Sequence, residues 1–496
     1  MGRKEEIIKE RIKKVVELMD KNINPYAYRF DVKDYSKEIK EKYKKLKNNQ
    51  KTKDKVVIAG RVMTIRDLGK LIFGTVQDSQ GRIQIILQKE ETDKNSFELF
   101  KKYIDAGDFV GINGSIMKTK TGEISVLVKK LELLTKSILP LPEKWHGLQD
   151  KEERYRKRYL DLIMNPEVKQ VFEKRQKVFD AIREFLTSRG FLEVQTPVLQ
   201  PIYGGTNAKP FESKLNSLDM KVYMRISNEM YLKRLIVGGY DKIFEFSPDF
   251  RNEGIDKLHN PEFTQVETMW AYANYEDNMK LWPELVEYIT KKLYGKTKIK
   301  IGDNEIDFKA PWTKIKFIDS IKKYAKVNVS DIKDLEEAKK IVKKLNIDVD
   351  KCNSVGEVLI NIFEEIVQPK IIQPTLVYDY PKEAAVLSRS EDGKYAKSFE
   401  VIINGWEIAL SYCEENDPVL LKKKWEEQEK ALKKGDEEAQ RMDLEFINAL
   451  ETGMPPTSGV GMGIDRLVML MTNQPSIRDV ILFPFMKPEE EKSDKE

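Results

Sequence analysis

The side chains of this chain that could carry chemistry are carboxylates and arginines, because histidines and thiols are scarce. Among 496 residues, the histidines are His146 and His259 and the cysteines are Cys352 and Cys413. A zinc site takes about four such ligands close together, and a Ser or Cys nucleophile needs a histidine base. We therefore expect no zinc and no disulfide framework. The residue types favour charge neutralisation by arginines and by carboxylate-held Mg²⁺.

The first informative stretch covers residues 240–275 and reads as strand, loop, strand. Arg251 ends the first strand, where its planar guanidinium could reach a phosphate. In the second strand, period-2 alternation places Phe263 and Glu267 on one face, together with Gln265 and Met269. Phe263 could stack on a purine. An ordinary hairpin with a salt-bridged surface explains the stretch, taken alone, equally well.

A second hairpin is predicted over residues 399–418, since Asn404-Gly405 is a strong type I′ turn signal. The turn places Glu400 and Glu407 on one face as diagonal neighbours. Two carboxylates so placed can share the Mg²⁺ ions that bridge ATP phosphates. The alternative is a pair of glutamates on a solvated sheet face.

The same turn register pairs Glu400 with Ala409 and puts Glu414 on the face opposite Glu407. If Glu407 and Glu414 line one pocket, the strand must contain a β-bulge between them.

A third stretch, residues 453–473, is a glycine-rich strand that runs into an apolar helix with Arg466 in its first turn. Glycines let a ligand lie against the backbone, and the start of a helix favours anions. A purely structural glycine-rich strand is the competing interpretation.

The elements that must position these residues form an α+β arrangement that follows a small β domain. Residues 55–137 contain five short strands with a helical stretch between the third and fourth, which is typical of an OB-fold barrel that binds nucleic acid. Later strands and helices indicate an antiparallel sheet flanked by helices. The expected organisation is a helix and basic linker (1–54), the OB domain (55–137), a linker (138–149), a catalytic domain (150–488) with a helical insertion-like stretch (310–395), and a disordered tail (489–496).

The bulk composition fits a globular protein with a heavily solvated surface. Charged residues make up 34% and hydrophobic residues 40% of the chain, and the net charge is +5. The positive charge is compatible with a nucleic-acid partner but lower than that of a dedicated DNA-binding protein. Charges interrupt the N-terminal helix pattern over residues 5–20, so we expect neither a signal peptide nor membrane association, and a cytoplasmic protein.

Taken together, these motifs resemble the class II aminoacyl-tRNA synthetases, and among them most closely the lysyl-tRNA synthetase family. Residues 190–197 (GFLEVQTP) are similar to the first class II motif, FRNEG with HNPEFT to the second, and GMGIDR to the third. The stretches YLKRLIVGGYDKIFEF and SIRDVILFPFMKP point to the lysine enzyme. The resemblance covers residues 55–488.

The resemblance implies ATP-dependent formation of lysyl-adenylate, transfer to the 3′ end of tRNA(Lys), and a homodimer. A substrate carboxylate is already ionised at neutral pH, so the reaction needs no histidine base. The implied catalytic and ATP-binding residues are Arg251, Glu253, His259, Asn260, Phe263 and Arg466, with Glu400 and Glu407 on Mg²⁺. The implied lysine-binding residues are Gly205, Glu229, Glu267, Tyr412 and Glu414. The implied anticodon-binding residues are Arg66, Phe73, Gln84 and Glu123.

The chain departs from the family pattern in the amino-acid pocket. Met269 stands where the lysine enzyme usually has a tyrosine, and Leu410-Ser411 and Glu415 replace an Asn-Gly pair and a leucine. Losing a polar contact in a specificity pocket can reduce discrimination. Two alternatives therefore stay open: a related synthetase with another substrate, and a catalytically silent paralogue that binds tRNA.

Overall fold

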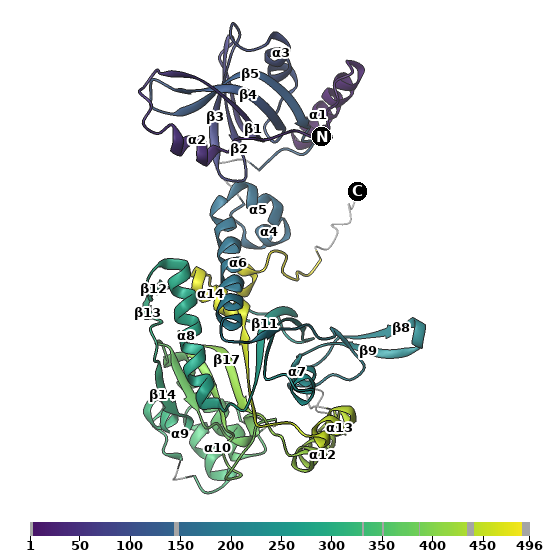
Figure 1. The fold of residues 1–496 in the computed structure, drawn as a ribbon, viewed down its shortest axis with the longest axis vertical. Helices are drawn as coiled ribbons and strands as arrows, with labels where there is room; N and C mark the ends of the chain where they lie inside the picture. Colours follow the sequence, from purple (N-terminus) through teal and green to yellow (C-terminus); the bar gives the residue numbers. More distant parts are fainter. Residues whose placement is uncertain are drawn as a thin grey trace. The chain divides into compact units, whose positions relative to one another are not determined.

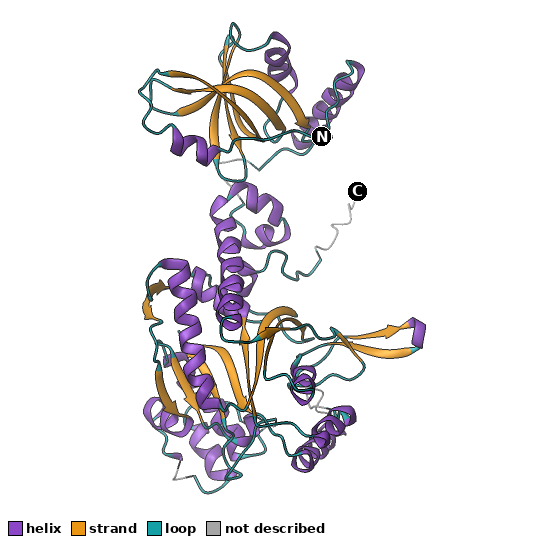
Figure 2. Cartoon of the chain, in the orientation of Figure 1, coloured by secondary structure: helices purple, strands orange, loops and turns teal. Residues whose placement is uncertain are grey.

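The computed structural model describes residues 3–142, 148–329, 332–349, 352–385, 387–433 and 441–488. The predicted tail (489–496) and the middle of the predicted linker (143–147, with His146) lie outside them. The chain divides into two compact units (Figures 1 and 2). The first comprises Met1–Arg154 and Tyr159–Pro166, and the second comprises Tyr155–Arg158 and Glu167–Glu496. No helix among the described residues is long and apolar enough to cross a membrane.

The first unit is built on a closed five-stranded barrel, which confirms the predicted OB-type fold. Its strands are β1 (Lys51–Asp67), β2 (Leu71–Gln77), β3 (Arg82–Gln88), β4 (Phe109–Lys118) and β5 (Ile124–Thr135), in the order β1-β2-β3-β5-β4. Side chains in β2 alternate between half-buried and buried, so that Ile72 and Val76 enter the core. The helix predicted between the third and fourth strands is α3 (Lys94–Tyr103).

Four short helices complete the first unit or border it: α1 (Arg3–Asp20), α2 (Ser36–Lys42), α4 (Lys151–Arg156) and α5 (Arg158–Met164). The helix α1 buries Arg11 and Leu18, whereas Ile12, Val16 and Met19 are about half exposed. The helix is therefore attached to the barrel by Leu18 in the apolar core and by polar contacts of Arg11 and Lys14, the latter paired with Asp105 at 2.8 Å.

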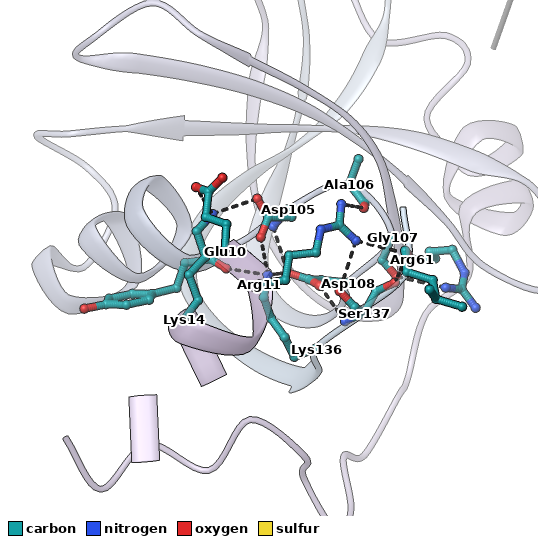
Figure 3. Close-up of polar contacts among 12 residues, drawn as sticks. Glu10, Arg11, Lys14, Arg61, Asp105, Ala106, Gly107, Asp108, Lys136 and Ser137 are labelled. Atoms are coloured by element: carbon teal, nitrogen blue, oxygen red, sulfur yellow. Dashed lines mark hydrogen bonds and ion pairs between the residues drawn. The ribbon is translucent and has the colours of Figure 1, made fainter. Parts of the chain in front are cut away.

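A buried polar cluster makes that attachment (Figure 3). The fully buried ammonium of Lys136 donates to Oδ2 of Asp108 and to the Tyr103 carbonyl, both at 2.7 Å, and also pairs with Asp105. Arg11 donates to the carbonyls of Ala106 (2.9 Å), Ser137 (3.0 Å) and Leu139 (3.1 Å). Each buried charge thus has partners, which offsets the cost of its desolvation.

The second unit is built on an eight-stranded, mostly antiparallel sheet in the order β14-β15-β16-β17-β18-β11-β10-β6. The strands are β6 (Leu192–Glu193), β10 (Lys242–Phe250), β11 (Glu262–Ala271), β14 (Thr313–Lys316), β15 (Thr375–Tyr378), β16 (Ser398–Ile403), β17 (Trp406–Cys413) and β18 (Thr457–Gly463). One face packs on α6 (Pro166–Thr187), α8 (Tyr275–Tyr294) and α14 (Ile464–Thr472) around the largest apolar core. The other face is left for a site.

The remaining elements surround this sheet. The stretch 310–395 is largely helical and has its own apolar core, with α9 (Phe317–Ser320), α10 (Leu335–Lys343), α11 (Val355–Ile362) and two π-helical turns, η2 (Ile321–Ala325) and η4 (Phe363–Val367). Helix α7 (Glu229–Val237) packs with α12 (Pro418–Lys433) and α13 (Leu444–Thr452). Smaller elements are the sheet β7 (Leu199–Gln200), β9 (Met220–Met224) and β8 (Glu212–Leu215), the pair β12 (Lys298–Ile301) and β13 (Asn304–Asp307), and α15 (Ile477–Val480).

The predicted pairing of Glu400 with Ala409 is wrong. Ala409 lies opposite Val401 and Glu407 opposite Ile402, so Ile408 is an extra residue in β17, and Glu400 lies opposite Leu410. The β-bulge required for Glu407 and Glu414 to face one pocket is therefore present.

Candidate active site

The free face of the sheet carries a cavity of about 340 Å³ in the second unit. Its floor is β18, where Gly461 lies between Glu267 of β11 and Leu410 of β17. Gly459 takes the corresponding place between Met269 and Tyr412. Because these glycines have no side chains, the neighbouring strands can line the cavity while its centre stays open.

The predicted face of β11 lines the cavity, with Phe263, Gln265, Glu267 and Met269 all contributing. Opposite them, β17 contributes Glu407, Ile408, Leu410 and Tyr412, and Glu414 follows the strand. Glu407 and Glu414 share one cavity because the bulge at Ile408 reverses the alternation between them.

One end of the cavity combines cationic and aromatic groups. The guanidinium of Arg251 lies over the ring of Phe263, 5.0 Å from its centroid. Arg466 donates from Nη1 to the backbone oxygen (2.9 Å) and Oε2 (3.2 Å) of Glu407, and its Nη2 lies 3.0 Å from Nε2 of His259. Arg466 thereby joins the loop between β10 and β11 to β17. Two arginines beside a stackable ring suit a nucleotide with its phosphates.

Beside this end lie Glu400 and Glu407. Oε2 of Glu400 accepts a hydrogen bond from the Tyr380 hydroxyl at 2.8 Å. Burial first, and then the charge of Glu407, raise the pKa of Glu400 well above its usual value. A divalent cation between them would relieve that repulsion, so the pair fits Mg²⁺. Among the described residues, no group of three or more His, Cys, Asp or Glu side chains is placed to hold a metal ion.

The other end of the cavity is acidic and buried. Glu229, Glu267 and Glu414 are each no more than 5% exposed. Among the described residues, neither carboxylate oxygen of Glu414 has a well-aligned hydrogen bond, although both are buried and Oε2 forms an ion pair with Lys233. Burial raises the pKa of Glu414 to about 7, and that of Glu267 well above its usual value. Such carboxylates suit a ligand that brings ammonium groups.

Gly205 borders the acidic end of the cavity, and two constraints require a glycine at this position. Its φ of +97° lies in the left-handed region, and a Cβ there would lie 2.8 Å from Oγ of Ser227 and 3.2 Å from Cβ of Glu229. The loop can therefore approach the Glu229 carboxylate closely.

The structure brings together nearly all the site residues predicted for the second unit. The residues that line the cavity are Gly205, Glu229, Arg251, Glu253, His259, Asn260, Phe263, Glu267, Glu407, Tyr412, Glu414 and Arg466. Glu400 does not line the cavity, although it lies opposite Leu410, which does.

Three further residues of this site were not predicted from the sequence: Lys233, Tyr380 and Asp465. Lys233 follows Glu229 by four residues on α7, a helical spacing that could have indicated their ion pair. Asp465 accepts from the Thr264 amide (2.6 Å) and pairs with Arg175, so it positions β11 beside α14. Tyr380 lies 20 residues before Glu400, and no spacing rule connects them.

The four residues predicted in the OB domain lie on one face of the barrel. Arg66 of β1 lies directly opposite Phe73 of β2. Gln84 of β3 lies opposite Thr75, which follows Phe73 by two residues in β2. Gln84 also lies beside Ser125, and the Ser125 hydroxyl donates to Oε1 of Gln84 at 2.8 Å. Glu123 precedes Ser125 by two residues. Glu123 pairs with Lys40 at 3.1 Å. Arg66, Phe73 and Gln84 thus lie on three neighbouring strands, β1, β2 and β3, and Glu123 immediately precedes β5.

Comparisons with known proteins agree with both units. A family model described as "tRNA synthetases class II (D, K and N)" matches residues 150–487, and one described as "OB-fold nucleic acid binding domain" matches residues 56–134. The lysine–tRNA ligase of Pelotomaculum thermopropionicum is 47% identical over 496 residues, which cover 99% of this chain and 97% of the relative. Those of Thermoanaerobacter pseudethanolicus (47%, covering 97% and 96%) and Methanoculleus marisnigri (46%, covering 96% and 94%) are similar. The chain therefore belongs to the class II tRNA synthetases, within the family of the lysine–tRNA ligases.

Proposed function

We propose that the protein uses ATP to activate L-lysine as lysyl-adenylate and transfers the lysyl group to the 3′ end of tRNA(Lys). The observation that carries the proposal is the polarity of this cavity. Arg251 and Arg466 stand at one end, and the buried carboxylates Glu229 and Glu414 stand at the other. A ligand with a carboxylate that meets ATP and with two ammonium groups matches this polarity.

In the proposed reaction, the lysine carboxylate attacks the α-phosphate of ATP and pyrophosphate leaves. Arg251 would hold the attacking carboxylate and the α-phosphate, so that charge is neutralised as the new bond forms. Phe263 would stack on adenine, and Arg466 would cap the γ-phosphate. Glu253, His259 and Asn260, which line the cavity beside these groups, would contact ATP.

Mg²⁺ would be held by Glu400 and Glu407 and would neutralise ATP phosphate charge when bound. The interaction of Tyr380 with Glu400 and of Arg466 with Glu407 would orient the two carboxylates toward it.

The ammonium groups of lysine would meet carboxylates. Glu229, with the Gly205 loop, would bind the α-amino group, and Glu414 with Glu267 would bind the ε-ammonium, while Tyr412 packs along the stem. Met269 contributes no hydroxyl at this end. The buried carboxylate of Glu414, oriented by its ion pair with Lys233, would supply the acceptor for the ε-ammonium without that hydroxyl.

For the OB unit we propose that Arg66, Phe73, Gln84 and Glu123 bind the anticodon. Phe73 would stack on a base and the polar three would contact base edges. The shared face of these residues supports the assignment. Phe73→Leu should weaken tRNA(Lys) aminoacylation while leaving ATP–pyrophosphate exchange unchanged. A parallel loss of both activities would contradict it.

We further propose a cytoplasmic homodimer. Its support is the exposure of Leu192 (49%) on the edge strand β6, with Leu199 (55%) and Tyr240 (45%) also exposed. A monomeric mass in light scattering at working concentration would overturn the dimer.

The decisive experiment is ATP–pyrophosphate exchange with each of the twenty amino acids in the presence of Mg²⁺. Exchange with lysine is expected, and Arg251→Ala should abolish it while tRNA binding persists. Arg189→Ala, which removes an arginine whose side chain is 39% exposed, serves as the matched control. Exchange with another amino acid would overturn the substrate, and no exchange would overturn the activity.

A further inference from the structure

A buried ammonium joins the two carboxylates at the acidic end of the cavity. Nζ of Lys233 lies 2.5 Å from Oε2 of Glu414 and also pairs with Oε1 of Glu229. All three side chains are no more than 7% exposed. Glu229 and Lys233 lie one turn apart on α7, while Glu414 follows β17, so the ammonium bridges a helix and the sheet.

Lys233 stands behind this wall of the cavity. Glu229 and Glu414 line the cavity and Lys233 does not. The contacts with Lys233 use one oxygen of each carboxylate, Oε1 of Glu229 and Oε2 of Glu414. Oε1 of Glu414 lies beside Gly459, away from the ion pair, and neither oxygen of Glu414 has a well-aligned hydrogen bond among the described residues. Pairing with Lys233 therefore fixes the orientation of both carboxylates without using their second oxygens.

We propose that Lys233 is a positioning residue for amino-acid selection: it orients Glu229 and Glu414 and sets the charge of the pocket to match a substrate with two ammonium groups. This inference rests on the proposed function, because it assigns those carboxylates to the amino acid.

The charges of the pocket support this match. Burial raises the pKa values of Glu267 and Glu414, so their full charge develops only as a cationic ligand binds. With that ligand bound, Glu229, Glu267 and Glu414 carry three negative charges and Lys233 carries one positive charge, which leaves two negative charges for the ligand. Lysine supplies two ammonium groups. An amino acid with one ammonium would leave a buried carboxylate without a partner, which is strongly unfavourable. The number of ammonium groups on the substrate, more than the shape of its side chain, would then exclude apolar amino acids.

Further charged groups lie around the pocket. Asp249 of β10 faces Arg225 and Arg251 and adds to the repulsion that raises the pKa of Glu267, and Tyr412 of β17 is a further titratable group beside the carboxylates. Burial alone would lower the pKa of Lys233, but Glu229 and Glu414 raise it above its usual value. For Tyr412, burial raises the pKa, so its hydroxyl stays neutral. Lys233 is therefore cationic throughout the neutral range.

The first test is substrate selection by Lys233→Met, which keeps the length of the side chain and removes its charge. The KM for lysine in pyrophosphate exchange should rise about tenfold or more, with the KM for ATP within about twofold of wild type. Lys233→Arg should restore part of the loss. Arg234→Met is the matched control, because Arg234 is the next residue of α7 but pairs with Asp443 away from the cavity. Equal changes in both KM values would overturn the proposal.

The second test needs no substrate. Without the ammonium, the pKa values of the buried carboxylates rise further, so the folded state of Lys233→Met loses stability as pH increases. The difference in Tm between wild type and Lys233→Met should therefore widen from pH 5.5 to pH 8.5. Parallel curves would show that Lys233 contributes only packing and would overturn the proposal.

The two tests separate this inference from the proposed function. If wild-type protein activates an amino acid other than lysine while the Tm difference still widens with pH, the proposed substrate fails and Lys233 remains the counter-charge of the carboxylates. If wild type activates lysine and Lys233→Met retains its lysine KM, the proposed function stands and the role of Lys233 is refuted.

Discussion

Gly459 and Glu414 approach each other so closely that no side chain fits between them: a Cβ on Gly459 would lie 2.5 Å from Oε1 of Glu414. The same Cβ would lie 2.7 Å from Sδ of Met269. The glycine strand therefore leaves room for the buried carboxylate of Glu414, neither oxygen of which has a well-aligned hydrogen bond among the described residues.

Gly459→Ala should displace Glu414 and reduce kcat/KM for lysine about 100-fold, while the KM for ATP stays within about twofold. Pyrophosphate exchange measures both. A Gly459→Ala enzyme with a wild-type lysine KM would separate Glu414 from substrate binding.

Binding of lysine should weaken as pH falls below 7. Burial raises the pKa of Glu414 to about 7, an effect that Lys233 partly offsets. A protonated carboxyl cannot pair with an ammonium, so the substrate must compete with a proton. The KM for lysine should be about tenfold higher at pH 6 than at pH 8, as expected for one group with a pKa near 7. Exchange at pH 6, 7 and 8 measures it, and Glu414→Gln should bind lysine weakly at every pH.

Lys136→Met should destabilise the first unit. The substitution leaves the carboxylate of Asp108, which is fully buried, without its cation. Removing one partner of a buried pair costs about 3–5 kcal/mol. Hydrogen exchange in the full-length protein should show faster exchange across the barrel strands. Lys130→Met is the control, because the Lys130–Glu132 pair is exposed and should change exchange very little.

The sequence predicts the barrel well because each of its strands alternates over a single core. The attachment of α1 was harder to foresee. Its apolar stripe leaves Ile12 and Val16 about half exposed, whereas Arg11 is buried. A prediction from hydrophobic periodicity places every charged residue on the surface. It therefore misses Arg11, whose buried guanidinium donates hydrogen bonds to backbone carbonyls.

In the second unit, local patterns predicted the faces of β11 and β17, but the register of the hairpin required tertiary information. A turn type fixes only the nearest pairs, so the bulge at Ile408 moved Glu400 from Ala409 to Leu410. Lys233 was missed for a related reason. Its partner Glu414 lies 181 positions away, and only the folded chain brings them together.

Glu407→Gln should raise the Mg²⁺ concentration needed for half-maximal exchange about tenfold, because the site loses one of its two carboxylates. The substitution preserves the side-chain shape and the backbone contact of Glu407 with Arg466, so nucleotide positioning should change less than metal dependence. It also removes the charge that, after burial, raises the pKa of Glu400. Tyr380→Phe tests the other carboxylate, since it deletes only the hydrogen bond to Glu400 and should shift the Mg²⁺ requirement by a smaller factor. Titration of Mg²⁺ at fixed ATP and lysine compares the three proteins, and identical midpoints would exclude Glu400 and Glu407 as the metal-binding pair.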